Sequence, residues 1–417
     1  MTTRRSELPV AIIGGGLAGL AAGLRLQELD VDFEIFESSD GPGGRVRSDQ
    51  VGDYICDRGF QLVNLDYPDL ARFYRPADFH RSSKAIDVVI DSKVHRLGDP
   101  REKFSRFFSS LNPATGSPLE KIRFLKFIRG LKSQSNLTHR GHNDESFEEA
   151  MVALGIGSLY SRVIRPFAQG VFLERCDQVS AEMAYKLIQF FINGTPGLPI
   201  GGVSSLARNL AKDLPINFNT HVDEIGEGFL RFGKRKRRAR KIILATDALA
   251  AKLLLGDAHI DSSLDSKIFD LMTMSTSTTW YHALDDADLD ATLRIDGLGA
   301  GPVTNSIAIS KLAPEYSPPG KTLISSTVIG SASENTSESS VRRHLASIWG
   351  METGGWELIA KYVIKKSLPH HPPGKPINSY LALGERILVV GDHVSFPSQQ
   401  GALESGVAAA EKIVETI

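Results

Sequence analysis

Three glycines near the start of the chain have the spacing expected of a loop that holds a phosphate. Gly14, Gly16 and Gly19 fit the pattern G-x-G-x-x-G. The pattern follows VAII, a β-branched run typical of a buried strand, and opens LAGLAAGL, whose leucines and alanines recur at helical spacing. Glycines at such a strand-to-helix turn let the backbone approach a pyrophosphate, and the helix start supplies free N–H groups. The turn Gly14, Gly15, Gly16, Leu17, Ala18 and Gly19 is therefore predicted to bind a dinucleotide.

An acidic residue stands where the ribose of that dinucleotide would lie. The next apolar run, VDFEIFE, ends at Glu37, which is 23 residues after Gly14, and Ser38 follows it. In β-α-β nucleotide folds a carboxylate at about this distance hydrogen-bonds the ribose 2′-hydroxyl. The spacing favours dinucleotide binding over a glycine turn with a purely structural role.

Two further glycine clusters indicate which dinucleotide is bound. In GGR at 43–45, Gly44 leaves space and Arg45 could pair with a phosphate through two hydrogen bonds. Near the other end, VVGD ends at Asp392, and a helix is predicted to begin at about Gly401. A carboxylate there can accept hydrogen bonds from sugar hydroxyls, and a helix amino terminus stabilises the negative charge of a reduced flavin. NAD presents no such group, so FAD is predicted.

Length and composition limit the alternatives. The 417 residues are 41% hydrophobic and carry a formal net charge of −1, which predicts two or three domains and gives no attraction for nucleic acid. Cys56 and Cys176 show neither metal-ligand spacing nor a disulfide framework, so we expect no metal and a reducing, cytoplasmic setting. No apolar run is long enough to predict a membrane-spanning helix, and the amino terminus has no apolar signal region.

The order of elements predicts an α/β fold with a discontinuous, Rossmann-like FAD-binding domain and an interwoven α+β substrate domain. Buried strands are expected at both ends and at KIILATD, and they are separated by helical and strand-rich segments. The predicted ranges are 1–80, 204–265 and 381–417 for the FAD-binding domain, and 81–203 and 266–380 for the substrate domain, with a largely helical insertion at about 101–190.

Seven motifs occur in an order that resembles the flavin-containing amine oxidoreductase superfamily, which includes monoamine oxidases, protoporphyrinogen oxidases and plant-type phytoene desaturases. They are AIIGGGLAGLAAG, GGR, DRGFQ, RPFAQGVFL, PIGGVSSLARNLA, THVDEI and VVGDHVSFPSQQGALESG. The resemblance implies the glutathione-reductase-type FAD domain, and it is closest to a branch without an assigned substrate. It also implies that Val222 contacts adenine, that Gly59, Phe60 and Gln61 line the isoalloxazine, and that Gly391, Asp392, Gly401 and Ala402 close the flavin site.

Two departures from the amine oxidases bear on the reaction. The segment MSTSTTWYHAL lacks their lysine, and Pro397 to Gln400 stand where they carry a cage aromatic. No cysteine lies near the end motif, so non-covalent FAD is expected. These departures favour hydride removal from an apolar or mixed-polarity small molecule, with oxygen or a quinone reoxidising the flavin. An amine oxidase with an altered cage and a flavin-bound membrane-surface protein without turnover remain alternatives.

Four features have two interpretations each. His393 is a candidate acid or base but could simply pack, and Gln61 could orient substrate or only contact flavin. GKRKRRARK at 233–241 could attract anions, yet a turn of solvated charges is favoured. REKFSRFFSSL and KIRFLKFIRGLK predict basic amphipathic helices, which could contact a membrane peripherally or, as favoured here, cover the substrate cavity.

Overall fold

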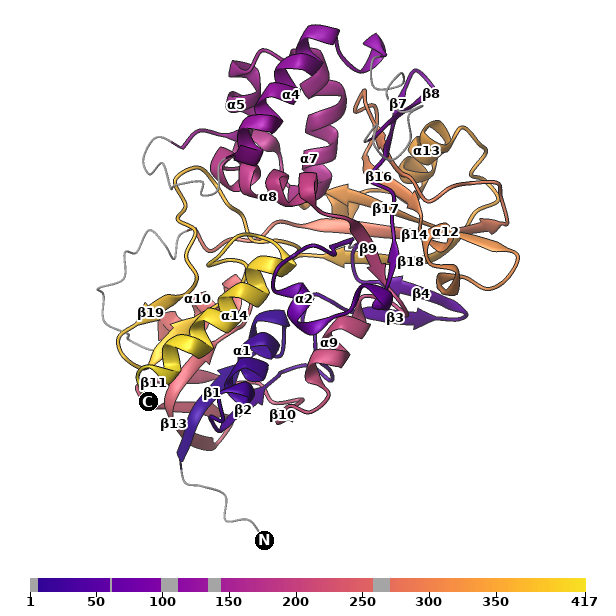
Figure 1. Cartoon of the computed structure of the whole chain (residues 1–417). Helices are drawn as coiled ribbons and strands as arrows, with labels where there is room; N and C mark the ends of the chain where they lie inside the picture. Colours follow the sequence, from indigo (N-terminus) through magenta and orange to yellow (C-terminus); the bar gives the residue numbers. More distant parts are fainter. Residues whose placement is uncertain (1–6, 61, 99–111, 134–143, 258–270) are drawn as a thin grey trace.

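The computed structural model describes residues 7–60, 62–98, 112–133, 144–257 and 271–417. The structure has two large sheets and a layer of helices, and the first and last strands of the chain lie in the same sheet (Figure 1). This mixed α/β architecture confirms the predicted fold class.

The first sheet joins three distant parts of the chain. Its central strands run parallel, because β1 pairs with β2 on one side and β13 on the other, and β13 also pairs with β20. β10 extends the parallel edge next to β2, and β11 and β12 form a hairpin onto the first half of β13. The bounds are β1 Glu7–Ile13, β2 Phe33–Phe36, β10 Ile216–Asn217, β11 Glu224–Gly226, β12 Phe229–Phe232, β13 Arg235–Leu244, β19 Leu381–Leu383 and β20 Ile387–Val389.

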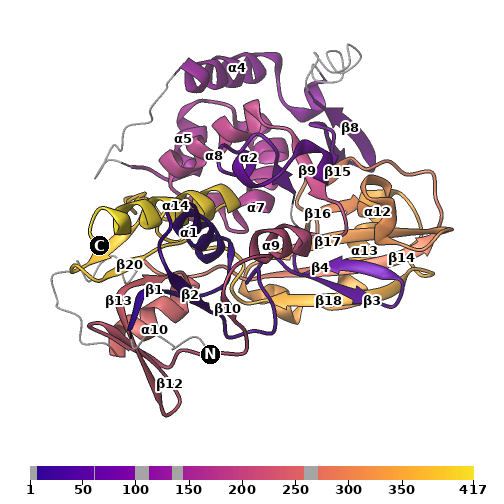
Figure 2. The ribbon, with the colours of Figure 1, turned by 60° about the horizontal axis from the view of Figure 1, so that its bottom comes forward.

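Helices cover both faces of the first sheet (Figure 2). Val10 and Ile12 of β1 face α1, α9 and α14, whereas Ala11 and Ile13 face α10, because successive side chains of a strand point to opposite faces. Burial on both sides explains the unbroken apolar run of β1. The helices are α1 Leu17–Glu28, α9 Ser204–Ala211, α10 Ala248–Asp257 and α14 Gln399–Val414.

The second sheet has the order β18-β14-β17-β16-β15-β7-β8 and is antiparallel except where β15 pairs with β7. Its long central strands are almost wholly buried, and α12 and α13 pack against it. The bounds are β7 Ile86–Ile90, β8 Lys93–Leu97, β14 Ser277–Asp285, β15 Leu293–Asp296, β16 Val303–Ala308, β17 Lys321–Ile329, β18 Glu357–Ile364, α12 Ile309–Leu312 and α13 Glu338–Trp349.

A helical layer lies over the second sheet (Figure 1) and has its own apolar core around Phe147, Met151 and Met183. It comprises α4 Pro118–Ser133, α5 Phe147–Ala153, α6 Gly157–Leu159, the π-helical turn Tyr160–Ile164, α7 Arg165–Phe172 and α8 Ala181–Asn193. The smaller elements that connect the layers are β3 Ser48–Val51, β4 Tyr54–Asp57, β5 Val63–Asn64, α2 Leu70–Phe73, β6 Phe79–Arg81 and β9 Pro196–Pro199.

The segments that form each sheet fall within the ranges predicted for the two domains, and the domain boundaries themselves stay a prediction. The basic run at 233–241 is not confined to a turn, because β13 begins at Arg235 and carries most of it. Arg237 pairs with Glu34 and Lys236 lies over the ring of Phe229, whereas Arg235, Arg238 and Arg240 are exposed to solvent. The amphipathic segment at 101–111 lies outside the described residues.

The contact between α1 and α14 gives a test of how the two ends of the chain are held together. A Cβ added to Gly406 of α14 would overlap the carbonyl oxygen of Ala18 in α1. We expect Gly406→Ala to lower the free energy of unfolding by about 1–3 kcal/mol, because overpacking forces the helices apart. Urea unfolding measures this change. In the control Gly130→Ala on α4, the new methyl group meets nothing within 4 Å, so equal stability of the two variants would contradict the packing argument.

Candidate functional site

The predicted nucleotide-binding residues converge at one edge of the first sheet. Gly14 follows β1, Glu37 follows β2, Asp247 lies beyond β13, and Asp392 lies beyond β20. Parallel pairing aligns Ile13 with Leu244 and Leu244 with Val389, so these carboxyl ends lie side by side. In α/β sheets ligands bind in the crevice at this edge. A cavity of about 1740 Å³ opens there and extends toward the helical layer.

The glycine turn has the backbone geometry that the sequence predicts. Gly14 has φ +107°, and a Cβ there would lie 2.6 Å from the carbonyl oxygen of Ala245. A Cβ on Gly19 would overlap the carbonyl oxygen of Gly14, so this glycine lets α1 pack on the strand. Gly16 caps α1 without a side-chain hydrogen bond, and a Cβ there would point into open space. The start of α1 thus presents unshielded N–H groups to the cavity.

Glu37 directly follows β2 and is hydrogen-bonded to the glycine turn. Its carboxylate is 7% exposed, and Oε2 accepts a hydrogen bond of 2.6 Å from the Gly15 N–H. The other oxygen, Oε1, accepts from the N–H of Ser39 and from the hydroxyls of Ser38 and Ser39. Glu37 and Ser38 both line the cavity, and their contact with a ribose stays a prediction.

Arg45 and Asp392 form a bidentate ion pair across the cavity. Arg45 Nη1 and Nη2 donate to the two carboxylate oxygens of Asp392 at 2.8 and 2.6 Å, and Nη1 also donates to the carbonyl oxygen of Ser367. The two residues were predicted to contact a phosphate and a sugar hydroxyl, respectively. The structure brings them together and keeps both in the lining of the cavity.

Most of the predicted cofactor residues line this one cavity, and their individual roles stay predictions. The lining contains Gly14, Gly16, Leu17, Ala18, Glu37, Ser38, Gly44, Arg45, Gly59, Phe60, Val222, Gly391, Asp392 and Ala402. Gly15, Gly19 and Gly401 are not in the lining. A Cβ on Gly401 would overlap the carbonyl oxygen of Phe396, so its place is to let α14 pack under that loop. Gln61 lies outside the described residues.

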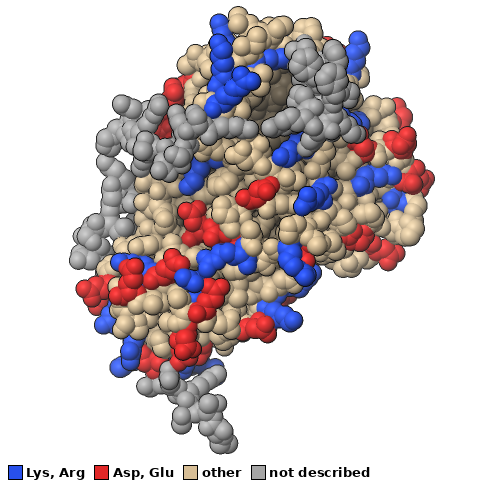
Figure 3. All heavy atoms as spheres, viewed as in Figure 1, with Lys and Arg blue, Asp and Glu red and all other residues tan. Residues whose placement is uncertain are grey.

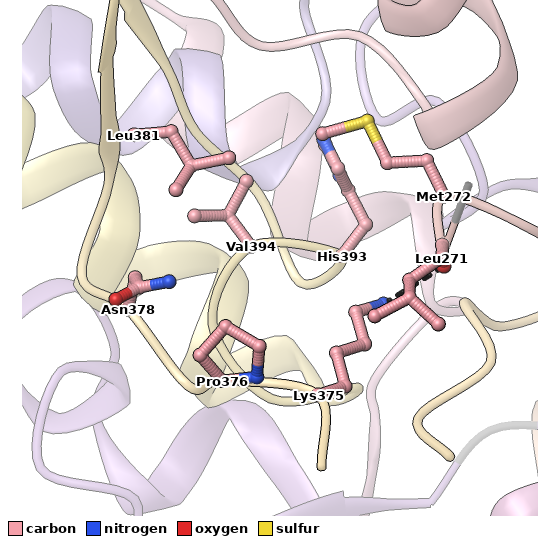
Figure 4. Close-up of a pocket in the computed structure, with 8 residues that line it drawn as sticks. All are labelled: Leu271, Met272, Lys375, Pro376, Asn378, Leu381, His393 and Val394. Carbon is pink, nitrogen blue, oxygen red and sulfur yellow. Dashed lines mark hydrogen bonds between the residues drawn. The ribbon is translucent and has the colours of Figure 1, made fainter. Parts of the chain in front are cut away.

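His393 lies away from the cavity, in contrast to its neighbour Asp392. Its ring borders a separate space of about 10 Å³ beside Met272 and Lys375 (Figure 4). The side chain is 2% exposed, and Nε2 has no hydrogen-bond partner among the described residues. Burial lowers the pKa of His393 to about 4, which keeps the ring neutral at physiological pH. The geometry therefore supports the packing interpretation and not a catalytic acid or base.

Asp57 is a buried residue that the sequence analysis did not single out. It precedes Gly59 and Phe60, which line the cavity. Its carboxylate accepts hydrogen bonds from the hydroxyls of Ser48 and Tyr316 at 2.6 and 2.8 Å and from the Val203 N–H at 3.1 Å. The motif DRGFQ was the available signal. Only the fold shows that its aspartate faces the protein interior and ties the cavity-lining loop to the segments of Ser48, Val203 and Tyr316.

Another missed pair follows β13. Asp247 and Lys366 form an ion pair of 3.0 Å, and both line the cavity near the glycine turn. The available signal was the end of KIILATD, because a polar residue after a buried parallel strand lies at the ligand-binding edge.

The far part of the cavity, here called the chamber, is built mainly from apolar side chains of the helical layer and the second sheet. It is lined by Phe124, Leu125, Ile128, Phe147, Leu159, Val163, Ile164, Phe167, Val171, Phe172, Leu187, Ile188, Phe191, Ile192, Leu293 and Ile295. Pockets for drug-sized ligands occupy about 300–1,000 Å³. The full cavity is larger, so it has space for a dinucleotide and a second molecule together.

The residues present fit a flavin dinucleotide. The uncapped start of α1 suits a diphosphate, Glu37 suits a ribose, and the start of α14 lies at the cavity through Ser398, Gln399 and Ala402. A helix amino terminus favours negative charge on a ring placed before it. The fold and the site are those expected of a protein that binds a dinucleotide beside an apolar chamber.

Comparison with known proteins identifies the family. The family model for flavin-containing amine oxidoreductases matches residues 17–414. The chain therefore belongs to this family of oxidoreductases, as its motifs predicted.

Individual relatives are distant. A zeta-carotene-forming phytoene desaturase of Myxococcus xanthus is 29% identical over 132 residues, which cover 28% of this chain and 24% of the relative's length. An oxidoreductase of Methanosarcina mazei has a similar structure, with a TM-score of 0.76, 17% identity, and coverage of 97% of this chain and 99% of that one. The structure of putrescine oxidase bound to putrescine also matches with a TM-score of 0.76. Its sequence is 14% identical, and the match covers 98% of this chain and 99% of that one. At these identities the two structures show the shared fold alone.

Within the described residues, no helix combines the length and apolar character needed to cross a membrane.

The burial of Asp57 predicts a specific dependence of stability on pH. Burial raises its pKa from 3.8 to about 6, so the folded protein keeps a proton that the unfolded chain releases between these values. The stability that this proton contributes is present below pH 3.8 and is lost as the pH rises through about 6. We expect Asp57→Asn to gain up to about 3 kcal/mol relative to the wild type between pH 4 and 7.

Urea unfolding across this pH range measures the difference. Asp49→Asn is the control, since the hydrogen bond from Arg58 lowers the pKa of Asp49 and its removal should have the opposite slope. Parallel pH profiles for Asp57→Asn and the wild type would contradict the assignment.

Proposed function

We propose that this protein is an oxidoreductase that binds FAD non-covalently and removes a hydride from an apolar or mixed-polarity small molecule. The observation that carries the proposal is the single cavity, in which a nucleotide-binding edge continues into an apolar chamber. Bound flavin would supply the hydride acceptor. The protein's own residues would bind the diphosphate at α1, hold the ribose at Glu37 and shield the reacting carbon from water in the chamber.

The distribution of charge supports a substrate that is not a cation. The acidic residues in the described lining, Glu37, Asp223, Asp247 and Asp392, belong to the nucleotide-binding edge. The charged residues lining the cavity near the chamber are Lys84, Lys121 and Arg129. A protonated amine would find no counter-charge there, so the apolar body of a substrate is the better match.

Non-covalent attachment is supported by the positions of the cysteines. Cys56 and Cys176 are both buried, and neither lines the cavity. Burial raises the pKa of each thiol to about 12, so neither offers a reactive thiolate. The acceptor that reoxidises the flavin, oxygen or a quinone, and the cytoplasmic setting remain part of the proposal.

An amine oxidase with an altered cage is the second candidate, because putrescine oxidase shares the fold. Ser277 and Thr279 of β14 line the cavity, and the strand contains no lysine. Phe396 is fully buried and stacks on Phe190, so it is not available as half of a cage.

A flavin-bound protein that acts at a membrane surface is the third candidate, and α4 is the observation in its favour. Leu119, Ile122 and Leu125 are more than half exposed on this helix, which also carries five Lys and Arg residues. Figure 3 shows a hollow beside α4 with Lys and Arg next to it. Because Phe124 and Ile128 of the same helix line the chamber, the covering role explains part of its apolar character.

Gly16 offers a test of flavin binding that leaves the fold intact. Its φ is −76°, and a side chain would meet no protein atom but would occupy the space before α1. We expect Gly16→Val to weaken FAD binding by about tenfold or more, since hydrogen bonds to charged groups contribute about 1.5–3 kcal/mol each. Flavin absorbance per chain and titration of the apoprotein measure this loss.

The control is Gly157→Val, at another helix start where a Cβ meets nothing within 4 Å and no cavity residue is changed. Both variants should unfold at the same urea concentration as the wild type. Unchanged FAD affinity in Gly16→Val would contradict the assignment of the start of α1 as the diphosphate site.

Anaerobic reduction of the holoenzyme distinguishes the three candidate functions. We expect isoprenoid or porphyrinogen substrates to bleach the visible flavin absorbance and simple amines not to, because the chamber offers apolar contact and no anion. FAD-depleted Gly16→Val protein serves as the blank. Rapid bleaching by amines with peroxide release would instead favour the amine oxidase. No bleaching by any class, together with vesicle binding that salt weakens, would favour the membrane-surface protein.

A further inference from the structure

A side-chain amide at the cavity wall has no protein partner among the described residues. Asn305 of β16 is 4% exposed and lines the cavity. Its side-chain amide is open to the cavity and makes no hydrogen bond with any residue that the structure describes. An asparagine amide carries two donor hydrogens and an acceptor oxygen, and buried groups of this kind are normally bonded. A buried amide without protein partners at a cavity wall therefore indicates a position meant for a ligand.

The surrounding backbone makes room for this amide. Gly170 of α7 also lines the cavity, and a Cβ there would lie 2.6 Å from Asn305 Nδ2. Any larger residue at position 170 would press on the amide. The close approach of α7 to β16 thus fixes where the amide group sits, as expected of a group that must be oriented.

The neighbours of Asn305 in the sheet are uncharged. Ile295 of β15 and Thr327 of β17 are its register partners, and Thr327 in turn pairs with Thr279 of β14. All of them line the cavity. The two threonine Oγ1 atoms are buried and also lack partners among the described residues. A polar row thus crosses three strands beneath an otherwise apolar chamber, without a charged member.

We propose that Asn305 is a substrate-specificity residue that binds a neutral oxygen group, a hydroxyl or a carbonyl, on an otherwise apolar substrate. The inference rests on the proposed function, since it places the substrate in the chamber. A hydroxyl can accept from Nδ2 or donate to Oδ1, and a carbonyl can accept from Nδ2, whereas a hydrocarbon leaves the amide unpaired. A site built to bond a substrate hydroxyl discriminates strongly against the analogue that lacks it.

Equilibrium dialysis with two labelled probes tests the proposal. The probes are a fifteen-carbon isoprenoid alcohol and the matching hydrocarbon without the hydroxyl. We expect the wild-type holoenzyme to bind the alcohol about tenfold or more tightly than the hydrocarbon. In Asn305→Leu the ratio should fall toward one while hydrocarbon binding is retained. Thr304→Val is the control, because Thr304 is on the same strand but does not line the cavity, and its ratio should match the wild type.

A wild-type ratio near one, failure of both probes to bind, or an unchanged ratio in Asn305→Leu would overturn the proposal. Asn305→Val, which introduces a strand-favouring side chain without a hydrogen-bonding group, gives a second measurement if the leucine variant does not fold, and a lowered ratio is again expected. Dialysis does not depend on turnover. Selective alcohol binding, together with no flavin reduction by any of the candidate substrate classes, would therefore contradict the proposed hydride removal and leave the role of Asn305 standing.

Discussion

The structure depends on the packing of the two ends of the chain into one sheet. β1 and β20 flank β13 in parallel, and α1 crosses α14 at Gly406, where the absence of a side chain lets the helices touch. This contact brings Arg45 to Asp392 across 347 residues of sequence. Without it, the glycine turn and the final helix would be two unrelated anion sites, neither sufficient for the proposed FAD, in which a diphosphate links an adenosine to a redox ring.

The same cavity combines two physical environments. At the sheet edge, backbone N–H groups, Glu37 and the ion pair of Arg45 with Asp392 provide directional polar contacts. In the chamber, aromatic and branched side chains provide apolar contact area but few directional contacts with a substrate. The amide of Asn305 would orient the substrate through hydrogen bonds. Such a division suits hydride transfer, in which the cofactor must be held rigidly and a substrate carbon must be kept dry beside it.

Several groups near the site keep the backbone in place and do not take part in the chemistry. Asp57 joins the Gly59 loop to Ser48, Val203 and Tyr316, and Gly401 lets α14 begin directly under the Phe396 loop. His393 is buried beside a separate small space and does not line the cavity. These residues adjoin predicted cofactor contacts in sequence, which is why sequence proximity overestimates the number of functional side chains.

The sequence alone determined the fold class, the glycine turn, Glu37 and the family, because tight turns and buried parallel strands demand particular residues over short distances. It did not reveal the direction of His393, the burial of Asp57, the strand that carries the basic run, or the unpaired amide of Asn305. Each of these depends on neighbours far away in the chain, such as Tyr316 for Asp57 and Gly170 for Asn305. Burial and partnership arise only when distant segments pack, so the tertiary structure decided them.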